Sequence, residues 1–422
     1  MTSTVERATA PVVASGPSSL AARNRRRLTL WFATLAGVMV ATTWSVWLRL
    51  SQGMSVTDVT SQMPWGAWVA FYIFFVGLSA GAFLLSSLVY VFGMYQFERV
   101  GRAALLSAII SMGVALAFIG FDLGRFERGP STLLHFHWSS PLSWEVRFYL
   151  LYIALLIAEL TLAIRVQKRR MSVHKGHRWM RILGTIGVPL AIFGVHGGTG
   201  TIFAVVKARG MWFGGLFPVI FVVSAIVSGT ALLLLVYYLQ TRAVGRVPNV
   251  RLIRGMAAVL AAALGIDLGL TFYEFLVPIL ASEHHDLNII GIQAFGPMWW
   301  SFWIVQLGLG MVIPFLVLVI PALKRRTELV VAASALVIVG ILAVRFNIVV
   351  PPLLPPVIEG YPWNDYLPTP VEWGVSAFFI SGGVLVYSLV SAWLPIHDPD
   401  PADEPEPLAD RPTTQHAEEV TA

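Results

Sequence analysis

The sequence predicts an all-α integral membrane protein with about ten transmembrane helices. Of its 422 residues, 56% are hydrophobic and 12% are charged, and the mean hydropathy is +0.73. A soluble globular protein does not reach this balance. Two further observations are a series of apolar stretches long enough to cross a bilayer and an uneven distribution of Lys and Arg between the segments that connect them.

Ten stretches of roughly 18 or more mostly apolar residues are predicted to span the membrane. They cover residues 28–48, 66–92, 102–121, 148–165, 180–206, 214–239, 251–280, 298–320, 329–349 and 371–394. The basic residues support this count, because about 22 of the 29 Lys and Arg fall in the two tails and the even-numbered connections. By the positive-inside rule, both termini are expected in the cytoplasm.

The two ends of the chain are predicted to lie outside the helical core. Residues 1–27 form a basic cytoplasmic tail; its "RNRRRLTL" loosely resembles a twin-arginine export signal, but the long apolar run that follows favours an uncleaved helix at 28–48. Residues 350–394 form the last outer loop and the last helix. Residues 395–422 are acidic and rich in Pro, which predicts a disordered tail.

An internal repeat predicts that the eight central helices form two four-helix bundles. The segment from Gly66 matches the segment from Gly214, with Gly81 aligned to Gly229, and "FDLG" at 121–124 is answered by "IDLG" at 266–269. Four helices separate the copies, so both have the same orientation and the duplication is parallel. The bundles are expected at 64–206 and 211–349, with the helices at 28–48 and 371–394 as peripheral additions.

Ionisable side chains within the spans are the first candidates for function, because they are costly in a bilayer. At about 1.5 Å per residue, Asp122, His196 and Asp267 lie roughly 24 to 30 Å along helices that begin at the cytoplasmic face. All three are therefore expected in the outer half of the membrane. Glu159 is the exception, because it lies toward the cytoplasm.

The segment 122–147 is predicted to be an outward-facing loop that ends at the fourth helix. It brings Glu145, Arg147 and Trp144 to the level of His196 and Asp267, and it also carries His135 and His137. Such a cluster suits an amphipathic ligand that needs a proton acceptor, a proton donor and an apolar wall. The blander interpretations are that Trp144 anchors the membrane interface and that Asp122 pairs with Arg125 or Arg128.

The sequence predicts no metal centre in this chain. Cysteine is absent, which excludes disulfides, thiolate zinc sites and cysteine-bound iron–sulfur clusters. A six-coordinate b haem commonly needs two axial histidines at matched depth, whereas His196 is the only histidine well inside a predicted span. The net charge of +6 is explained by membrane topology, so nucleic-acid binding is not expected.

Two motifs resemble the polysulfide reductase membrane subunit family, also called the NrfD family. They are "PWGAWVAFYIFFVGLSAGAFLLSSLVY" at 64–90 and "FDLGRFERGPSTLLHFHWSSPLSWE" at 121–145. The ten predicted spans, "HGGTG" at 196–200 and "MWFGGLFPVIFVVSAIVSG" at 211–229 are most similar to its ten-helix branch, which includes the membrane subunit of a periplasmic uptake hydrogenase. The chain departs from many relatives at Phe126 and at "HWSSP", where Pro and an Asn-Pro pair are common.

This resemblance implies a haem-free subunit in the bacterial inner membrane that exchanges electrons with menaquinone or ubiquinone near the outer face. It implies an iron–sulfur partner on that face and a molybdopterin or nickel–iron catalytic subunit beyond it. Proton movement is a further expectation from the family. Matched position by position, the family's site residues fall on Asp122, Arg125, Glu145 and His196.

The combined hypothesis is a quinone site at which His196, Glu145 and Asp122 bind the head group and transfer protons. The other residues expected to line this site are Trp144, Arg147, Asp267 and Arg125. Two alternatives remain open: a transporter or channel built from two repeats, which would have a polar site at mid-membrane and broken helices, and a purely structural anchor. The anchor explains the topology but not the buried His196 and Asp267.

Overall fold

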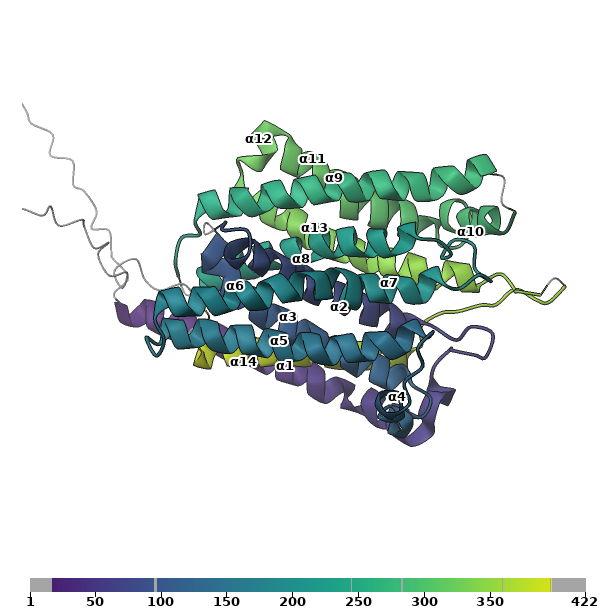
Figure 1. Ribbon diagram of the computed structural model, residues 1–422, viewed down its shortest axis with the longest axis horizontal. Helices are drawn as coiled ribbons and strands as arrows, with labels where there is room; N and C mark the ends of the chain where they lie inside the picture. The colour runs from purple at the N-terminus through teal and green to yellow at the C-terminus, as the bar shows by residue number, and fades with distance from the viewer. Residues whose placement is uncertain are drawn as a thin grey trace, which may run out of the picture.

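The structure, a computed structural model, describes residues 17–94, 97–243, 245–281, 284–358, 360–394 and 396 (Figure 1). The predicted acidic tail at 395–422 lies outside the described residues apart from Ile396, and most of the predicted basic tail lies outside them as well. Within the described part, the chain is a bundle of helices that run roughly along one axis.

Apolar runs form these helices because a helix satisfies every backbone hydrogen bond within its own segment. In chain order they are α1 (Pro17–Gln52), η1 (Gly53–Val56), α2 (Ala67–Tyr90), α3 (Glu98–Asp122), η3 (Phe126–Arg128), α4 (Ser131–Leu134), α5 (Pro141–Gln167), α6 (Val173–Pro189), η4 (Leu190–His196), α7 (Gly197–Ala204), α8 (Leu216–Ala243), α9 (Val250–Ala281), α10 (His284–Ala294), η5 (Trp300–Val312), α11 (Ile313–Val319), α12 (Pro321–Lys324), α13 (Thr327–Val349), η6 (Pro351–Leu353) and α14 (Pro370–Trp393). The segments η4 and η5 are π-helical.

Ten spans are long and apolar enough to cross a membrane within the described residues, which agrees with the predicted count. The segments α6, η4 and α7 run on as one span at Val173–Ala204, and η5 with α11 forms the span Trp300–Val319. The all-α membrane fold is therefore confirmed.

Helix α2 is the centre of the bundle, and α1 and α14 lie at its edge. In the most apolar stretch of α2, 89% of the residues are buried inside the bundle. The corresponding shares for α1 and α14 are 6% and 17%. The helices α1 and α14 pack on each other along one side (Figure 1). The prediction that the first and last helices are peripheral is correct.

The two helices aligned by the predicted repeat, α2 and α8, cross at the aligned glycines. A Cβ on Gly81 would collide with the carbonyl oxygen of Ala225, and a Cβ on Gly229 would collide with the backbone of Gly81. Small residues at such a crossing let two membrane helices approach closely. The crossing joins the two predicted halves, while the duplication itself stays a prediction.

The predicted bounds of two helices need correction. Helix α5 begins at Pro141 rather than at residue 148, because Pro141 suits the first helical position and the side chain of Ser140 accepts a hydrogen bond from the Ser143 amide. Glu145 and Arg147 therefore lie in the first two turns of α5 instead of preceding it. Helix α1 begins at Pro17, before the predicted residue 28.

Candidate functional site

Glu145 forms the centre of a buried hydrogen-bond network between α5, α7 and α2. Its side chain is 1% exposed. The Oε1 atom accepts hydrogen bonds from the Thr199 hydroxyl at 2.5 Å and the Tyr149 hydroxyl at 2.6 Å. The hydroxyl of Tyr149 lies 2.7 Å from that of Tyr72 on α2. These three hydroxyl residues are not among the site residues predicted from the sequence, although Tyr149 lies one helical turn after Glu145 on the same face.

The second carboxylate oxygen of Glu145 has a different environment. Oε2 is buried and has no hydrogen-bond partner among the described residues. An unpaired polar atom is costly in a protein interior, and such an atom in a native structure calls for an explanation such as a catalytic role or a bound group. Glu145 thus has one oxygen held in place and one oxygen available to accept a proton or a donor group.

His196 is the last residue of the π-helical segment η4 and is 1% exposed. The segment follows Pro189, which lacks an amide hydrogen and disturbs the regular helical ladder. Such π-helical turns often occur at functional sites. The imidazole lies 5.2 Å from the ring of Phe221, and Thr199, three residues later, bonds to Glu145. The chain segment 196–199 therefore connects the two main predicted site residues.

Arg345 on α13 contacts His196 and is not among the site residues predicted from the sequence. The guanidinium is fully buried, and its Nη2 atom lies 2.8 Å from the Ser224 hydroxyl and 3.4 Å from His196 Nε2. The signal was available: an arginine within the apolar run "LVIVGILAVRFNIVV" meets the rule that ionisable residues inside spans are candidates. In the count of Lys and Arg by membrane side, Arg345 was instead included among the charges on the outer side.

Asp267 on α9 is 3% exposed. The charge of Arg345 interacts electrostatically with Asp267 and also with Glu274, two turns further along α9. Asp267 and His196 thus both interact with Arg345, and a site common to the two stays a prediction. Whether Asp267 contacts a ligand stays a prediction.

Asp122 belongs to a different group of contacts, at the end of α3. Its charge interacts with Arg49 and Glu372, not with the predicted partners Arg125 and Arg128. Arg49, which is 2% exposed, donates hydrogen bonds of 2.7 to 3.0 Å to the carbonyl oxygens of Phe121 and Leu123. No hydrogen bond among the described residues joins Asp122 to Glu145 or His196.

The loop that leads into α14 completes this second group. Burial, together with the nearby Glu372 carboxylate, raises the pKa of Tyr366, so its hydroxyl stays protonated and donates to Glu372 Oε1 at 2.5 Å. Glu372 also accepts from the Thr369 amide in a capping box at the start of α14. Asp122 therefore lies where α1, α3 and α14 are fastened together.

Arg147 and Trp144, near the start of α5, bond to the loop that precedes this helix. Arg147 donates to the carbonyl oxygens of Ser143 at 2.6 Å and Leu133 at 2.8 Å, and its guanidinium lies 4.5 Å from the ring centroid of Phe136. Trp144 Nε1 donates to the carbonyl of Trp138 at 2.9 Å. His135, His137 and Arg125 are exposed in the same loop. The described contacts of Arg147 and Trp144 give the loop its shape.

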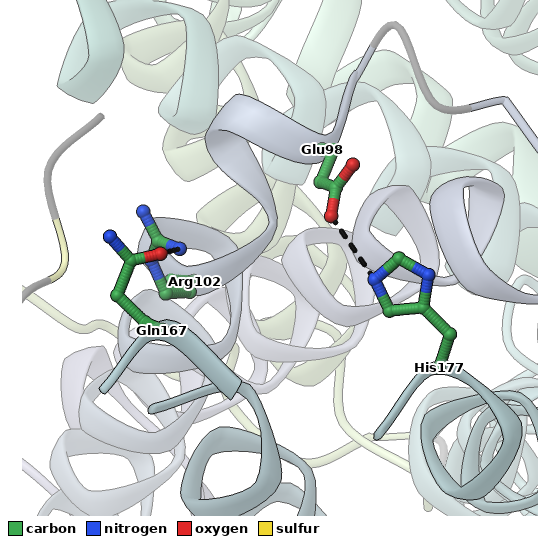
Figure 2. Close-up of polar contacts among 4 residues, drawn as sticks. All are labelled: Glu98, Arg102, Gln167 and His177. Carbon is green, nitrogen blue, oxygen red and sulfur yellow. Dashed lines mark hydrogen bonds and ion pairs between the residues drawn. The ribbon is translucent and has the colours of Figure 1, made fainter. Parts of the chain in front are cut away.

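The opposite end of the bundle carries another polar group (Figure 2). There, His177 on α6 pairs with Glu98 on α3 at 3.3 Å, and Arg102 on α3 donates to Gln167 on α5 at 2.7 Å. Glu159 on α5 is 2% exposed, with Oε1 unpartnered among the described residues. The paired residues fasten α3, α5 and α6 together. In the part of the chain that the structure describes, no group of three His, Asp or Glu side chains could hold a metal ion.

Comparison with known proteins places this arrangement in a family. The chain is 38% identical to a subunit of the selenate reductase of Mesobacillus selenatarsenatis, over 87% of this chain and 94% of that protein. It is 27% identical to the Hdr-like menaquinol oxidoreductase integral membrane subunit of Archaeoglobus fulgidus, over 77% and 82% of the two chains. It is 25% identical to the menaquinone reductase integral membrane subunit of Nitratidesulfovibrio vulgaris, over 88% and 93%.

Residues 55–355 match the family model described as polysulphide reductase, NrfD. This range includes every residue of the Glu145 network and of the His196–Arg345 pair. The resemblance found in the sequence motifs is confirmed, and the ten apolar helices are those of a multi-pass membrane protein. The chain belongs to the NrfD polysulphide reductase family.

Proposed function

We propose that this chain is the quinone-reactive membrane subunit of a respiratory oxidoreductase complex. The observation that carries the proposal is the buried carboxylate of Glu145, with one oxygen held by Thr199 and Tyr149 and the other without a partner among the described residues. Two relatives support the ligand class, because their names are menaquinol oxidoreductase and menaquinone reductase membrane subunits. Either menaquinone or ubiquinone satisfies the chemistry.

The residues present fit a quinone head group. A quinone supplies reversible two-electron, two-proton chemistry through two oxygens, which carry hydrogen in the reduced form. Glu145 Oε2 would accept the proton of one hydroxyl, while Thr199 and Tyr149 hold the carboxylate in position. His196 would contact an oxygen of the ring. Electrons pass to a partner, so this chain needs only to bind, orient and exchange protons.

The other predicted residues take supporting roles in the proposal. Asp267 shapes the site through Arg345. Asp122 carries protons at the loop end of the bundle rather than binding the ring, because its described contacts lie at the α1–α14 junction. Arg125 belongs to the loop that faces an iron–sulfur partner on the outer side, and Trp144 and Arg147 hold that loop from the start of α5. A molybdopterin or nickel–iron subunit would lie beyond that partner.

The test is turnover of the intact complex with quinone. Glu145→Gln and His196→Ala should abolish quinone-linked turnover, while the partner subunits remain active with an artificial dye. Glu159→Gln is the matched control, because it neutralises another buried carboxylate on the same helix that lies outside the Glu145 network. Full quinone turnover in both Glu145→Gln and His196→Ala would refute the assignment.

A transporter built from two repeats is the alternative, and one observation favours it. Regular α-helix is replaced by π-helical segments in both predicted halves, at η4 and η5, and a transporter would have interrupted helices at its binding site. Solute uptake by proteoliposomes that contain the purified chain, without any quinone-linked activity of its complex, would select this alternative.

A further inference from the structure

The most unusual charge in the described part of the protein is Arg345. It belongs to α13, contacts α8 and η4, and has no exposed surface. Its guanidinium carbon lies 4.6 Å from the ring centroid of Phe221, and Nη2 bonds to Ser224. Nε and Nη1 are buried and have no partner among the described residues. A buried guanidinium whose donors are only partly satisfied is costly unless another acceptor completes its shell.

The contact with His196 fixes the direction of the hydrogen bonds. Arginine only donates, so Nε2 of His196 must accept from Nη2 of Arg345, and the ring proton is assigned to Nδ1. That Nδ1 atom is also buried and without a partner among the described residues. Three nitrogen atoms, Nε and Nη1 of Arg345 and Nδ1 of His196, are therefore donors that lack an acceptor within the described part of the chain.

Gly77 on α2 lies directly against this pair. A Cβ at this position would lie 3.1 Å from His196 Nε2 and 3.6 Å from Arg345 Nη2. A real Cβ rarely approaches a neighbour at the shorter distance. The central helix α2 thus passes close to the two donor side chains, and it also carries Tyr72 of the Glu145 network.

We propose that Arg345 and His196 form a donor-only subsite that binds a carbonyl oxygen of an oxidised quinone. This inference rests on the proposed function and deepens it. The Arg345–His196 pair would bind an oxygen that only accepts hydrogen bonds, and the Glu145 cluster would bind a hydroxyl that donates one. A carbonyl oxygen has two lone pairs and no hydrogen, which suits a site made of N–H donors. A quinol hydroxyl can also accept, but the unpaired atoms of the pair are all donors and offer its own hydrogen no acceptor. Glu145 provides that acceptor instead.

The test is binding of a soluble naphthoquinone, menadione, and of its reduced diol to the purified complex without oxygen. Arg345→Lys keeps the charge but loses the planar donor fork. We expect it to raise the Kd of menadione about tenfold or more, corresponding to about 1.4 kcal/mol per factor of ten. The Kd of the diol should change less than about threefold. Glu145→Gln should show the reverse order.

Gly77→Ala is the second variant, because it changes no charge and alanine favours a helix over glycine. Its methyl group intrudes on the Arg345–His196 pair, so it should also weaken menadione binding more than diol binding. Gly113→Ala on α3 is the matched control, since a Cβ there meets nothing within 4 Å. Arg49→Lys controls for loss of a buried arginine whose described hydrogen bonds go to backbone carbonyls.

Each outcome is decisive. Equal loss of both ligands, or unchanged menadione binding in Arg345→Lys and Gly77→Ala, would overturn the subsite while leaving the proposed function intact. If Arg345→Lys fails to assemble, Gly77→Ala alone decides. Competition of formate or chloride for the site, without any effect of these variants on menadione, would assign the donors to a small anion and also overturn the inference. A wild-type complex that binds neither ligand would refute the proposed function itself.

Discussion

Two buried polar clusters in the described part of this protein have opposite hydrogen-bonding character. Around Glu145, hydroxyl groups donate to one oxygen, and the other oxygen is an acceptor without a partner among the described residues. Around Arg345, the atoms without a described partner are nitrogen donors. Both central side chains are at most 1% exposed. The difference shows that burial alone does not define a site. Whether the unpaired groups are donors or acceptors determines which chemical species each cluster can hold.

Reversing the charge of the donor cluster should have the largest effect. Arg345→Glu would place a carboxylate near Asp267 and Glu274 and remove the cation that offsets them. We expect a loss of stability of about 3–5 kcal/mol, because unpaired buried charges are that costly. The measurement is the yield of folded chain in membranes and its thermal unfolding. A folded, fully stable Arg345→Glu protein would show that the cation does not offset the two carboxylates.

The acceptor cluster can be tested by removing its hydroxyls one at a time. Tyr149→Phe deletes a donor to Glu145 Oε1, whereas Tyr72→Phe deletes a hydroxyl that lies 2.7 Å from that of Tyr149. We expect Tyr149→Phe to lower quinone turnover about tenfold and Tyr72→Phe to lower it less, consistent with a hydrogen bond to a charged group of about 1.5–3 kcal/mol. The reverse order would contradict the arrangement of this network. Steady-state turnover with a soluble quinol measures both.

The crossing of α2 and α8 can be tested without a substitution in either cluster. Gly81→Ala places a methyl group against the Ala225 carbonyl, so α2 and α8 must move apart. Overpacking of this kind costs about 1–3 kcal/mol, which thermal unfolding would detect. Gly120→Ala on α3 is the control, because a Cβ there meets nothing within 4 Å. Equal stability of the two variants would refute the close crossing.

The smallest effect is expected for Asp122→Asn. Its described interactions are with Arg49 and Glu372, so the substitution leaves both clusters unchanged. A supporting role in proton delivery predicts a drop in quinone turnover of about threefold to tenfold, well below the roughly 10²–10⁴-fold that a direct acid–base residue supplies. A loss as large as that of Glu145→Gln would contradict this supporting role and favour the sequence-based prediction that Asp122 binds the quinone head group.

Some site residues were predictable and others were not. His196, Glu145 and Asp267 could be found because an ionisable side chain in an apolar run stands out in one dimension. Arg345 met the same criterion and was missed because it was counted as a topological charge. Thr199, Tyr149 and Tyr72 could not be found this way, because hydroxyl residues are common in membrane helices and gain significance only from the carboxylate they contact.

Hydropathy and length predict a membrane protein of ten helices with peripheral first and last spans, and the sequence motifs identify the family. Hydropathy and length are local properties, and a helix satisfies its own backbone, so no tertiary contact is needed to predict a span. The folded molecule is needed to see that Arg345 contacts His196, that Thr199 contacts Glu145, and that Asp122 belongs with Arg49. The reason is physical: apolar side chains face both lipid and neighbouring helices, so apolar periodicity does not reveal which helix faces meet.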